Sequence, residues 1–532
     1  MDNRFYFGFN TSEERKKRRK AELYSMSEQV STFFWDEAPQ HGLEMREGQQ
    51  DMSFEIVDAL INDQHFAIEA GVGIGKSFGY LVPVLLYSKR MNKPVIIATS
   101  TIALQEQLWR DVHAVMPLLG LNRDVILAKG QTHYLCNKRA DEYMCDPKAD
   151  PPDALKEGIQ QGYEERKDFP EVLPQGVWDK VNVQRFSMKN CGSCEKKCKY
   201  YKVRAALKFT DGVVLCNQDF LTQHLMKLRR GQEGLINAAA DLLVVDEAHN
   251  LDDKVRSATT ERFGQGMLFG MIKSAFYELR SFDQSSVSGE KREAESAIIA
   301  FYNCLKAQVQ KQINEAEQDM RYADRFFFDN NGSAIELLTE MNAAIHNLSS
   351  SIQIYSSMDF RNNRSFAASD DLDAVSESLS ELLDRIDDML IWIEQHGSNT
   401  ELVYCPKNTK EIVSRLYFNG DERTILTSAT LTNATSGSLE EQYSYFISNT
   451  GFPAGDRGCL SEPKPSPYPY DEHAMIYYCD DLPHPTREHE AFIEKGVERL
   501  LEILSISNGK ALVLFTAKID MEEVYSILSE KN

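Results

Sequence analysis

The sequence predicts an α/β protein built on a parallel sheet with helices on both faces, and three observations predict it. Short apolar segments at 65–69, 94–98, 124–128, 212–216 and 242–246 alternate with amphipathic segments that begin near residues 76 and 102. The segment at 242–246 is continuously apolar, which is typical of a strand buried on both faces. A glycine-rich turn and an acidic pair each directly follow one of these segments. This alternation favours a parallel sheet.

Composition sets limits on the class of protein. The chain has 532 residues, of which 42% are apolar and 26% charged, so we expect a soluble protein of roughly three or four domains. It has no apolar run long enough for a membrane helix and no apolar start of signal-peptide type, so we expect a cytoplasmic protein without membrane contact. With 59 basic and 81 acidic residues the formal charge is −22, so any nucleic acid must bind through local basic surfaces.

The chain divides by texture into five parts. Residues 1–44 are a polar lead-in with a basic run at 15–20, which predicts either a solvated helix face or a nucleic-acid contact. The α/β texture fills 45–136 and 211–254, with 424–440 completing it. Residues 137–210 form an insertion between two strands, and residues 255–423 are expected to be helical. The α/β texture resumes over 441–532, with predicted strands at 474–478 and 511–515.

One apolar stripe is the basis for the helical prediction. Its spacing alternates between three and four residues, which places all seven members on one face of a long helix. The members are Leu372, Val375, Leu379, Leu382, Ile386, Met389 and Ile393.

The strongest motif is the glycine-rich segment 70–77, which lies between a strand and a helix as a P-loop does. Gly71, Gly73 and Gly75 allow backbone N–H groups to surround phosphate oxygens at a helix N-terminus. Lys76 is positioned to reach the β and γ phosphates of ATP, and Ser77 to hold Mg²⁺.

The second motif is the acidic end of the strand at 242–246. Asp246 is expected to hold Mg²⁺ and Glu247 to polarise the attacking water, because ligands bind at the carboxyl edge of such sheets. Together with the P-loop, this pair predicts ATP hydrolysis. His249, three residues after Asp246, is expected to link the nucleotide site to another part of the protein.

Weaker signals fit the same scheme. The hydroxyls at 99–101 are expected to contact a phosphate backbone, and those at 427–431 to couple the γ-phosphate to the strand-binding surface. Each segment alone would be no more than a helix cap. Arg46 and Gln49 precede the P-loop strand, and Gln49 is suited to hydrogen-bonding the adenine edge.

The cysteines suggest a metal centre. Cys191, Cys194 and Cys198 are closely spaced and Cys136 lies upstream, with Cys145 as a rival fourth ligand. Four thiolates suit either zinc or an iron–sulfur cluster, and the missing second pair of a zinc ribbon favours iron–sulfur. Around them, residues 185–230 contain eleven basic and three acidic residues with interleaved aromatics. That mixture is typical of single-strand binding, although a solvated basic loop has the same composition.

These motifs together resemble the DinG/XPD-like helicases of superfamily 2. The resemblance extends from about residue 44 to the end and rests on 46–49, 69–77, 99–108, 129–136, the cysteine trio, 217–218, 246–249 and 427–431. It implies a RecA-like motor domain with a 4Fe–4S insert at 137–210, ligated by Cys136, Cys191, Cys194 and Cys198. It also implies a helical Arch at 255–423, a second RecA-like domain starting at 441, and 5′ to 3′ movement on single-stranded or forked DNA.

One departure from the family changes the expected activity. The family's later motifs, including a Gln-x-x-Gly-Arg-x-x-Arg segment, do not occur, so we expect a truncated second motor domain with an unpaired edge at 511–515. Arginines from that domain normally stabilise the γ-phosphate, so the chain alone is expected to bind ATP·Mg and single strands but to hydrolyse poorly. A partner polypeptide would supply the rest of that domain.

The leading hypothesis is therefore an ATP-dependent 5′ to 3′ DNA helicase of the DinG type. The first alternative is a non-unwinding, ATP- and strand-binding module that needs such a partner. A third reading, an RNA-directed DEAH-type helicase, is disfavoured by the cysteine insert.

Overall fold

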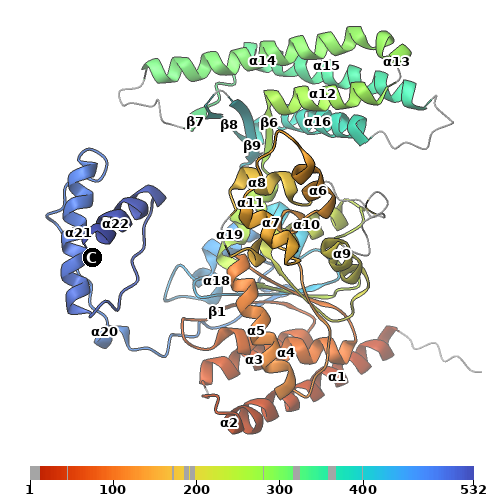
Figure 1. Ribbon diagram of the computed structural model, residues 1–532. Coiled ribbons are helices and arrows are strands. Elements are labelled where there is room, and N and C mark those ends of the chain that lie inside the picture. The colour runs from red at the N-terminus through yellow and green to blue at the C-terminus, as the bar shows by residue number, and fades with distance from the viewer. Residues whose placement is uncertain are drawn as a thin grey trace, which may run out of the picture. The chain divides into compact units, whose positions relative to one another are not determined.

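Figure 1 shows the computed structural model, which describes residues 12–44, 46–170, 173–184, 191, 198–279, 281–315, 324–357, 367–397 and 399–531. The chain divides into two compact units, Met1–Pro467 and Tyr468–Asn532. Every strand that the described residues form belongs to the larger unit.

The larger unit is built on a seven-stranded sheet in the order β11-β1-β10-β5-β2-β4-β3, and every neighbouring pair is parallel. This confirms the predicted α/β class. β5 (Leu242–Asp246) lies at the centre, between β10 (Arg423–Ser428) and β2 (Val95–Thr99). The other strands are β1 (His65–Glu69), β3 (Val125–Leu127), β4 (Val213–Asn217) and β11 (Gly458–Leu460).

Both faces of this sheet are covered, because alternate residues of its strands enter two different cores. On one face Ile97 and Val244 pack with α3 (Glu47–Ile61), α4 (Lys76–Met91) and α5 (Ile102–Leu118). On the other face Ile96 and Val245 enter a second core. The helices there are α10 (Gln218–Arg229), α11 (Leu251–Ala258), α17 (Lys410–Tyr417), α18 (Leu439–Gln442) and α19 (Ser444–Thr450).

The lead-in is part of this unit rather than a polar extension. α1 (Ser12–Thr32), a π-helical turn η1 (Phe33–Glu37) and α2 (Ala38–Gln40) bury Leu23, Met26 and Phe34 against α3 and α4. Within the basic run at 15–20 the structure describes the side chains of Arg19 and Lys20, and Arg19 donates a 3.1 Å hydrogen bond to the hydroxyl of Tyr87. This contact is internal.

The first insertion lies between β3 and β4 and has its own small core around Trp178, Leu155 and Phe169. Its helices are η2 (Gln131–His133), α6 (Asn137–Cys145), α7 (Asp153–Gln160), η3 (Arg166–Asp168), α8 (Gln175–Val181) and α9 (Lys199–Phe209). The indole Nε1 of Trp178 donates to the carbonyl oxygen of Thr132 at 2.7 Å, which ties α8 to the chain leaving the sheet.

The second insertion contains a helical layer whose members lie side by side in Figure 1. Its helices are α12 (Gln265–Glu278), α13 (Ser281–Ser286), α14 (Ser288–Glu315), α15 (Gly332–Ser357), α16 (Ala367–Asp384) and η5 (Ile386–Asp388). It also contains an antiparallel sheet in the order β6-β9-β8-β7, which the sequence interpretation missed. These strands are β6 (Glu261–Gly264), β7 (Arg325–Phe327), β8 (Met389–His396) and β9 (Asn399–Pro406).

The predicted single helix through 372–393 is wrong. The helix α16 ends at Asp384, and Met389 and Ile393 lie on the strand β8. Both side chains are nevertheless buried in the same core as Leu379. A spacing of four residues returns to one face in a strand as well as in a helix, so the stripe could not distinguish the two. α17 packs with α10 and α11, so the chain has already returned to the main sheet before residue 423.

The boundary between the two units falls later than residue 441. β11 pairs with β1, which keeps the chain in the larger unit up to Pro467. The smaller unit contains α20 (Tyr470–His473), α21 (His489–Ile506) and α22 (Lys518–Lys531), and the latter two meet at Ile493, Val497 and Val524.

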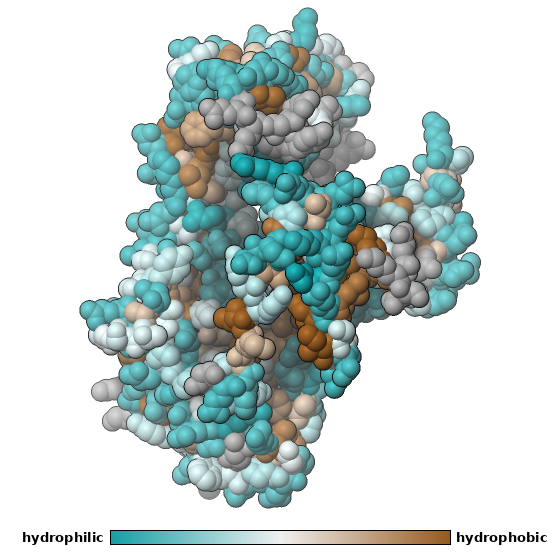
Figure 2. Space-filling model, turned by 90° about the vertical axis from the view of Figure 1, so that its left-hand side faces the viewer, coloured by the Kyte–Doolittle hydropathy of each residue, from teal (hydrophilic) through white to brown (hydrophobic). Residues whose placement is uncertain are grey.

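The strands predicted at 474–478 and 511–515 are irregular chain in the structure. Their apolar side chains lack a paired strand and are open to solvent: Ile476 is 95% and Leu512 86% exposed. Figure 2 shows that the visible face of the protein is mostly hydrophilic, with a few brown apolar patches.

Candidate active site

The glycine-rich segment 70–77 joins β1 to α4, as predicted from the sequence. Gly73 and Gly75 have φ values of 91° and 81°, which residues with a side chain rarely adopt. A Cβ on Gly75 would also lie 2.1 Å from the Nε2 of Gln49. The loop therefore needs glycine at position 75 for its conformation, and a Cβ there would also displace the end of the Gln49 side chain.

The acidic end of β5 meets the start of α4. The Nζ of Lys76 lies 2.9 Å from the Oδ1 of Asp246 and 2.6 Å from the Oε1 of Glu247. Burial alone would lower the pKa of Lys76, but these two carboxylates outweigh it and raise that pKa above its usual value. Burial raises the pKa of Asp246, although the charge of Lys76 opposes the shift. The structure thus brings together the three residues expected to carry hydrolysis.

His249 and the segment 427–431 also contact the carboxylate of Glu247. The Nδ1 of His249 lies 2.7 Å from the Oγ of Ser428 and 3.4 Å from the Oε2 of Glu247. The hydroxyl of Ser428 in turn donates to the same carboxylate oxygen at 3.5 Å. The end of β10 is therefore in contact with the acidic tip through two side chains.

Glu69, the last residue of β1, fixes the chain that follows this segment. Its Oε2 accepts hydrogen bonds from the backbone N–H groups of Leu431 and Thr432, both at 2.6 Å, and from the Thr432 hydroxyl at 2.8 Å. These hydrogen bonds tie the loop after β10 to the strand that precedes the P-loop.

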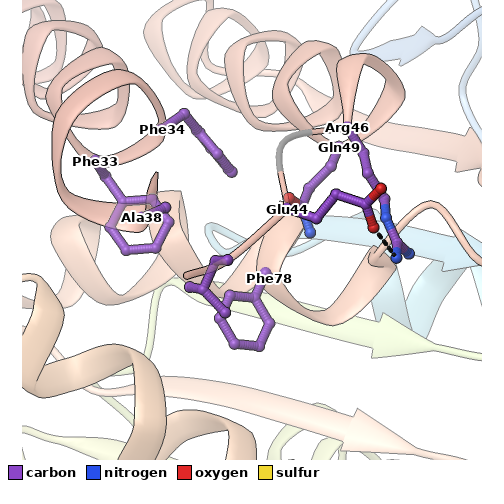
Figure 3. A pocket seen from close by; sticks show the side chains of 8 residues that line it. Phe33, Phe34, Ala38, Glu44, Arg46, Gln49 and Phe78 are labelled. Carbon is purple, nitrogen blue, oxygen red and sulfur yellow. Dashed lines mark hydrogen bonds and ion pairs between the residues drawn. The ribbon is translucent and has the colours of Figure 1, made fainter. Parts of the chain in front are cut away.

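Arg46 and Gln49 support the P-loop rather than facing open solvent. Arg46 donates to the carbonyl oxygen of Gly73 and pairs with Glu44, while the Nε2 of Gln49 donates to the carbonyl oxygen of Gly75 at 2.8 Å. Both side chains also line a cavity of about 240 Å³, which Figure 3 shows from close by. The other lining residues are Phe33, Phe34, Ala38, Leu43, Glu44 and Phe78.

Sequence reasoning missed several residues of this site. Phe33 and Phe34 come from the lead-in, and their adjacency in an otherwise polar segment was the available signal. Tyr80 is fully buried, and its hydroxyl donates to the Oδ2 of Asp246 at 3.4 Å. Burial and the carboxylate of Asp246 raise the pKa of Tyr80, so it stays a hydrogen-bond donor.

Two of the predicted cysteine ligands each directly precede a helix and pack against the same apolar group. Cys136 precedes α6 and Cys198 precedes α9, and both pack against the apolar group of Tyr134, Val183 and Tyr200. Burial raises the pKa of the Cys198 thiol, and so do the neighbouring thiols of Cys136 and Cys191.

The complete ligand set is not seen in the structure. Cys194 lies outside the described residues, and within them no group of three or more side chains is spaced to hold a metal ion. Cys145, the rival ligand, is exposed at the end of α6.

Three basic residues of the stretch that follows already have partners within the protein. Lys199 lies 2.8 Å from Glu165 and Lys208 lies 2.5 Å from Glu233. Arg204 is buried and donates to the carbonyl oxygen of Leu235. Of these three, Arg204 is the buried one and is not available to a nucleic acid, while residues 185–190 and 192–197 lie outside the described part of the chain.

A parallel sheet with a phosphate loop after β1 and an acidic tip on β5 is the arrangement of a RecA-like helicase domain. Residues 132–266 match the DEAD_2 family model. This match and the named relatives described below together confirm the resemblance to the DinG-like helicases of superfamily 2.

Three relatives illustrate the similarity. Probable ATP-dependent helicase YpvA of Bacillus subtilis is 24% identical over 93% of this chain and 75% of its own length. The 3′-5′ exonuclease DinG of the same organism is 25% identical over 92% of this chain and 56% of its own length. ATP-dependent DNA helicase YoaA of Escherichia coli is 30% identical over 42% of this chain and 36% of its own length. This chain thus spans three-quarters of the first relative and little more than half of the second.

The helices give no indication of a membrane span. Among the described residues, none is both long and apolar enough to cross a bilayer.

Proposed function

We propose that this chain is an ATP-hydrolysing DNA helicase motor of the DinG type, moving 5′ to 3′ on single-stranded DNA. The observation that carries the proposal is the approach of Lys76 to Asp246 and Glu247, within 2.9 and 2.6 Å. The relatives named ATP-dependent helicases support the same chemistry. The direction of movement rests on the family resemblance alone.

Each residue of the site has a distinct role in this proposal. Lys76 exchanges its carboxylate partners for the β and γ phosphates, and Glu247, once released, polarises the attacking water. Ser77 and Asp246 hold Mg²⁺, which when bound neutralises charge on the phosphates. The aromatic cavity beside Gln49 receives the adenine ring, with Phe33, Phe34 and Phe78 as its apolar walls. Ser428 and His249 couple the position of the Glu247 carboxylate to the end of β10 through their hydrogen bonds.

Strand-stimulated ATP hydrolysis tests this function. We expect single-stranded DNA to raise the hydrolysis rate of the wild-type chain, and Lys76→Ala to abolish both the basal and the stimulated rate. Stimulation by single-stranded RNA and not DNA would instead favour the RNA-directed alternative. A Lys76→Ala variant as active as the wild type would exclude this site.

A 4Fe–4S cluster bound by Cys136, Cys191, Cys194 and Cys198 is part of the proposal. What supports it is that Cys136 and Cys198 pack against the same apolar group of Tyr134, Val183 and Tyr200, although the three described thiols are not themselves spaced to hold a metal ion. Cluster and zinc are distinguished by the visible spectrum of anaerobically purified protein. A broad band near 400 nm, lost in Cys198→Ser, supports iron–sulfur, whereas a colourless protein with bound zinc contradicts it.

A second candidate is a nucleotide-gated strand-binding module without unwinding activity. Its support is that the described residues of the smaller unit form no strand, and so no second RecA-like sheet. Hydrolysis measured with and without an added polypeptide that carries a RecA-like second motor domain separates the two. Robust unwinding by this chain alone would exclude the second candidate.

A further inference from the structure

Glu247 has a backbone conformation that its side chain does not favour. Its φ and ψ are 56° and 46°, in the left-handed region that few residues other than glycine adopt. The same residue carries the carboxylate that meets Lys76 and Ser428. A strained backbone of this kind persists only where surrounding groups hold it, and such residues gather at functional sites.

The side chain that holds this backbone is Gln218. Its Nε2 donates to the carbonyl oxygen of Asp246 at 2.7 Å and to that of Glu247 at 3.0 Å. Both acceptors are carbonyls, so the orientation of the amide is fixed: the opposite flip would turn its oxygen toward them. Gln218 is fully buried, so solvent does not compete for either hydrogen bond.

Gln218 is itself rigidly placed. It is the first residue of α10, directly after β4, and the side chain of Asn217 caps that helix by accepting from the N–H of Phe220 at 2.9 Å. At the tip, the N–H of Glu247 donates to the Oδ1 of Asp246 at 3.0 Å. These three hydrogen bonds restrict the turn. The bond from the Glu247 N–H is local to the turn, whereas the two bonds to the carbonyls come from Gln218 on α10.

We propose that Gln218 is a positioning residue for Glu247: it clamps the carbonyls on both sides of the left-handed turn and so aims the Glu247 carboxylate at the attacking water. This inference rests on the proposed ATP hydrolysis. The side-chain amide of Gln218 bonds the backbone of the acidic tip, at Asp246 and Glu247, so we expect its loss to lower kcat and leave the affinity for ATP·Mg intact.

The test compares four chains in basal and strand-stimulated hydrolysis: wild type, Gln218→Met, Glu247→Gln and the double variant. Methionine keeps the shape of glutamine and removes the donor. We expect Gln218→Met to lower kcat by about 10- to 100-fold. In the double variant it should lower kcat no further than Glu247→Gln does alone, because the clamp acts only through that carboxylate. Binding of a fluorescent ATP analogue should stay within about twofold of wild type.

Thr222→Val is the matched control. It removes a buried hydroxyl one turn further along α10 that bonds the carbonyl of Gln218 and the hydroxyl of Tyr417, both at 2.8 Å. We expect it to lower the thermal midpoint as Gln218→Met does but to keep wild-type kcat. If Gln218→Met does not fold, Gln218→Asn decides, since it keeps the amide but withdraws it by one methylene.

The outcomes separate the two proposals. If Gln218→Met keeps the wild-type kcat, the positioning role of Gln218 is wrong and the proposed function is unaffected. If Gln218→Met does not fold, the same conclusion follows from a wild-type kcat in Gln218→Asn. Equal loss of kcat in Thr222→Val, or additive losses in the double variant, also overturns that role, because the effect would then be general. A wild-type chain that hydrolyses no faster than Glu247→Gln overturns both.

Discussion

Lys129 is the centre of a chain of charges that joins the cysteine-containing insertion to the main sheet. Its side chain is only 3% exposed, and its ammonium lies 2.8 Å from Glu106 on α5 and 3.0 Å from Glu165 in the insertion. Lys199, the residue after Cys198, reaches the other oxygen of Glu165 at 2.8 Å. We predict that Lys129→Met destabilises the larger unit and loosens this connection.

The magnitude follows from the partners that remain. Removing one member of a buried ion pair costs about 3–5 kcal/mol when the other charge is left alone. Here Glu165 keeps Lys199 and Glu106 keeps Lys167, which lies 3.0 Å away. We therefore expect about 2–3 kcal/mol, which corresponds to a thermal midpoint about 3–6 °C lower.

The dependence on pH has a definite sign. The hydrogen bond from Lys129 lowers the pKa of Glu106 below its usual 4.5. Burial opposes the shift at Glu165, but Lys199 and Lys129 together lower its pKa as well. Carboxyls with lowered pKa values stabilise the fold above pH 4.5, and that contribution disappears as the pH falls through the lowered values. The difference between wild type and Lys129→Met should therefore shrink in acid.

The thermal midpoints of both proteins can be measured over this pH range by tryptophan fluorescence, since Trp178 lies in the core of the insertion. Lys156→Met is the control, because Lys156 forms an exposed pair with Asp153 and its loss should change nothing measurable. A Lys129→Met midpoint equal to that of Lys156→Met at pH 7, or a difference that stays constant down to pH 3, would refute the argument.

Three further predictions follow from single contacts. Gly75→Ala should abolish ATP binding in a fluorescence titration, because its Cβ would lie 2.1 Å from Gln49 and its φ is 81°; retained affinity would contradict this. Burial and nearby Arg423 lower the pKa of His65 from 6.5 to about 4. The folded protein should therefore be fully stabilised above pH 6.5 and lose about 2 kcal/mol by pH 5, in denaturant unfolding, with a smaller loss in His65→Gln. Glu69→Gln should weaken strand stimulation of hydrolysis severalfold while sparing basal hydrolysis, because Glu69 fixes the loop after β10; unchanged stimulation would count against that coupling.

Much of the main sheet could be predicted because its signals are local. The strand at 242–246 is continuously apolar, and both of its faces are indeed buried. The P-loop and the acidic tip each follow a strand directly, and parallel strands bring their carboxyl ends to one edge. The approach of Lys76 to Asp246 follows from those rules without knowledge of the helices in between.

The missed features depend on distant parts of the chain. β7 has three residues and pairs with β8, which lies more than sixty positions later, so no local pattern marks it. Phe33 joins the cavity beside Gln49 only because α1 folds back onto α4. Nothing in the sequence indicates that the amide of Gln218 reaches the carbonyls of Asp246 and Glu247 at the end of β5.

The most direct test of the account is equilibrium binding of ATP with and without Mg²⁺ by isothermal titration calorimetry, in wild type, Lys76→Ala and Asp246→Asn. We expect the wild type to bind ATP more tightly when Mg²⁺ is present. We expect weak or no binding by Lys76→Ala, and binding by Asp246→Asn that no longer responds to the metal. Wild-type affinity and metal dependence in both variants would contradict a shared phosphate and magnesium site between the loop and the acidic strand end.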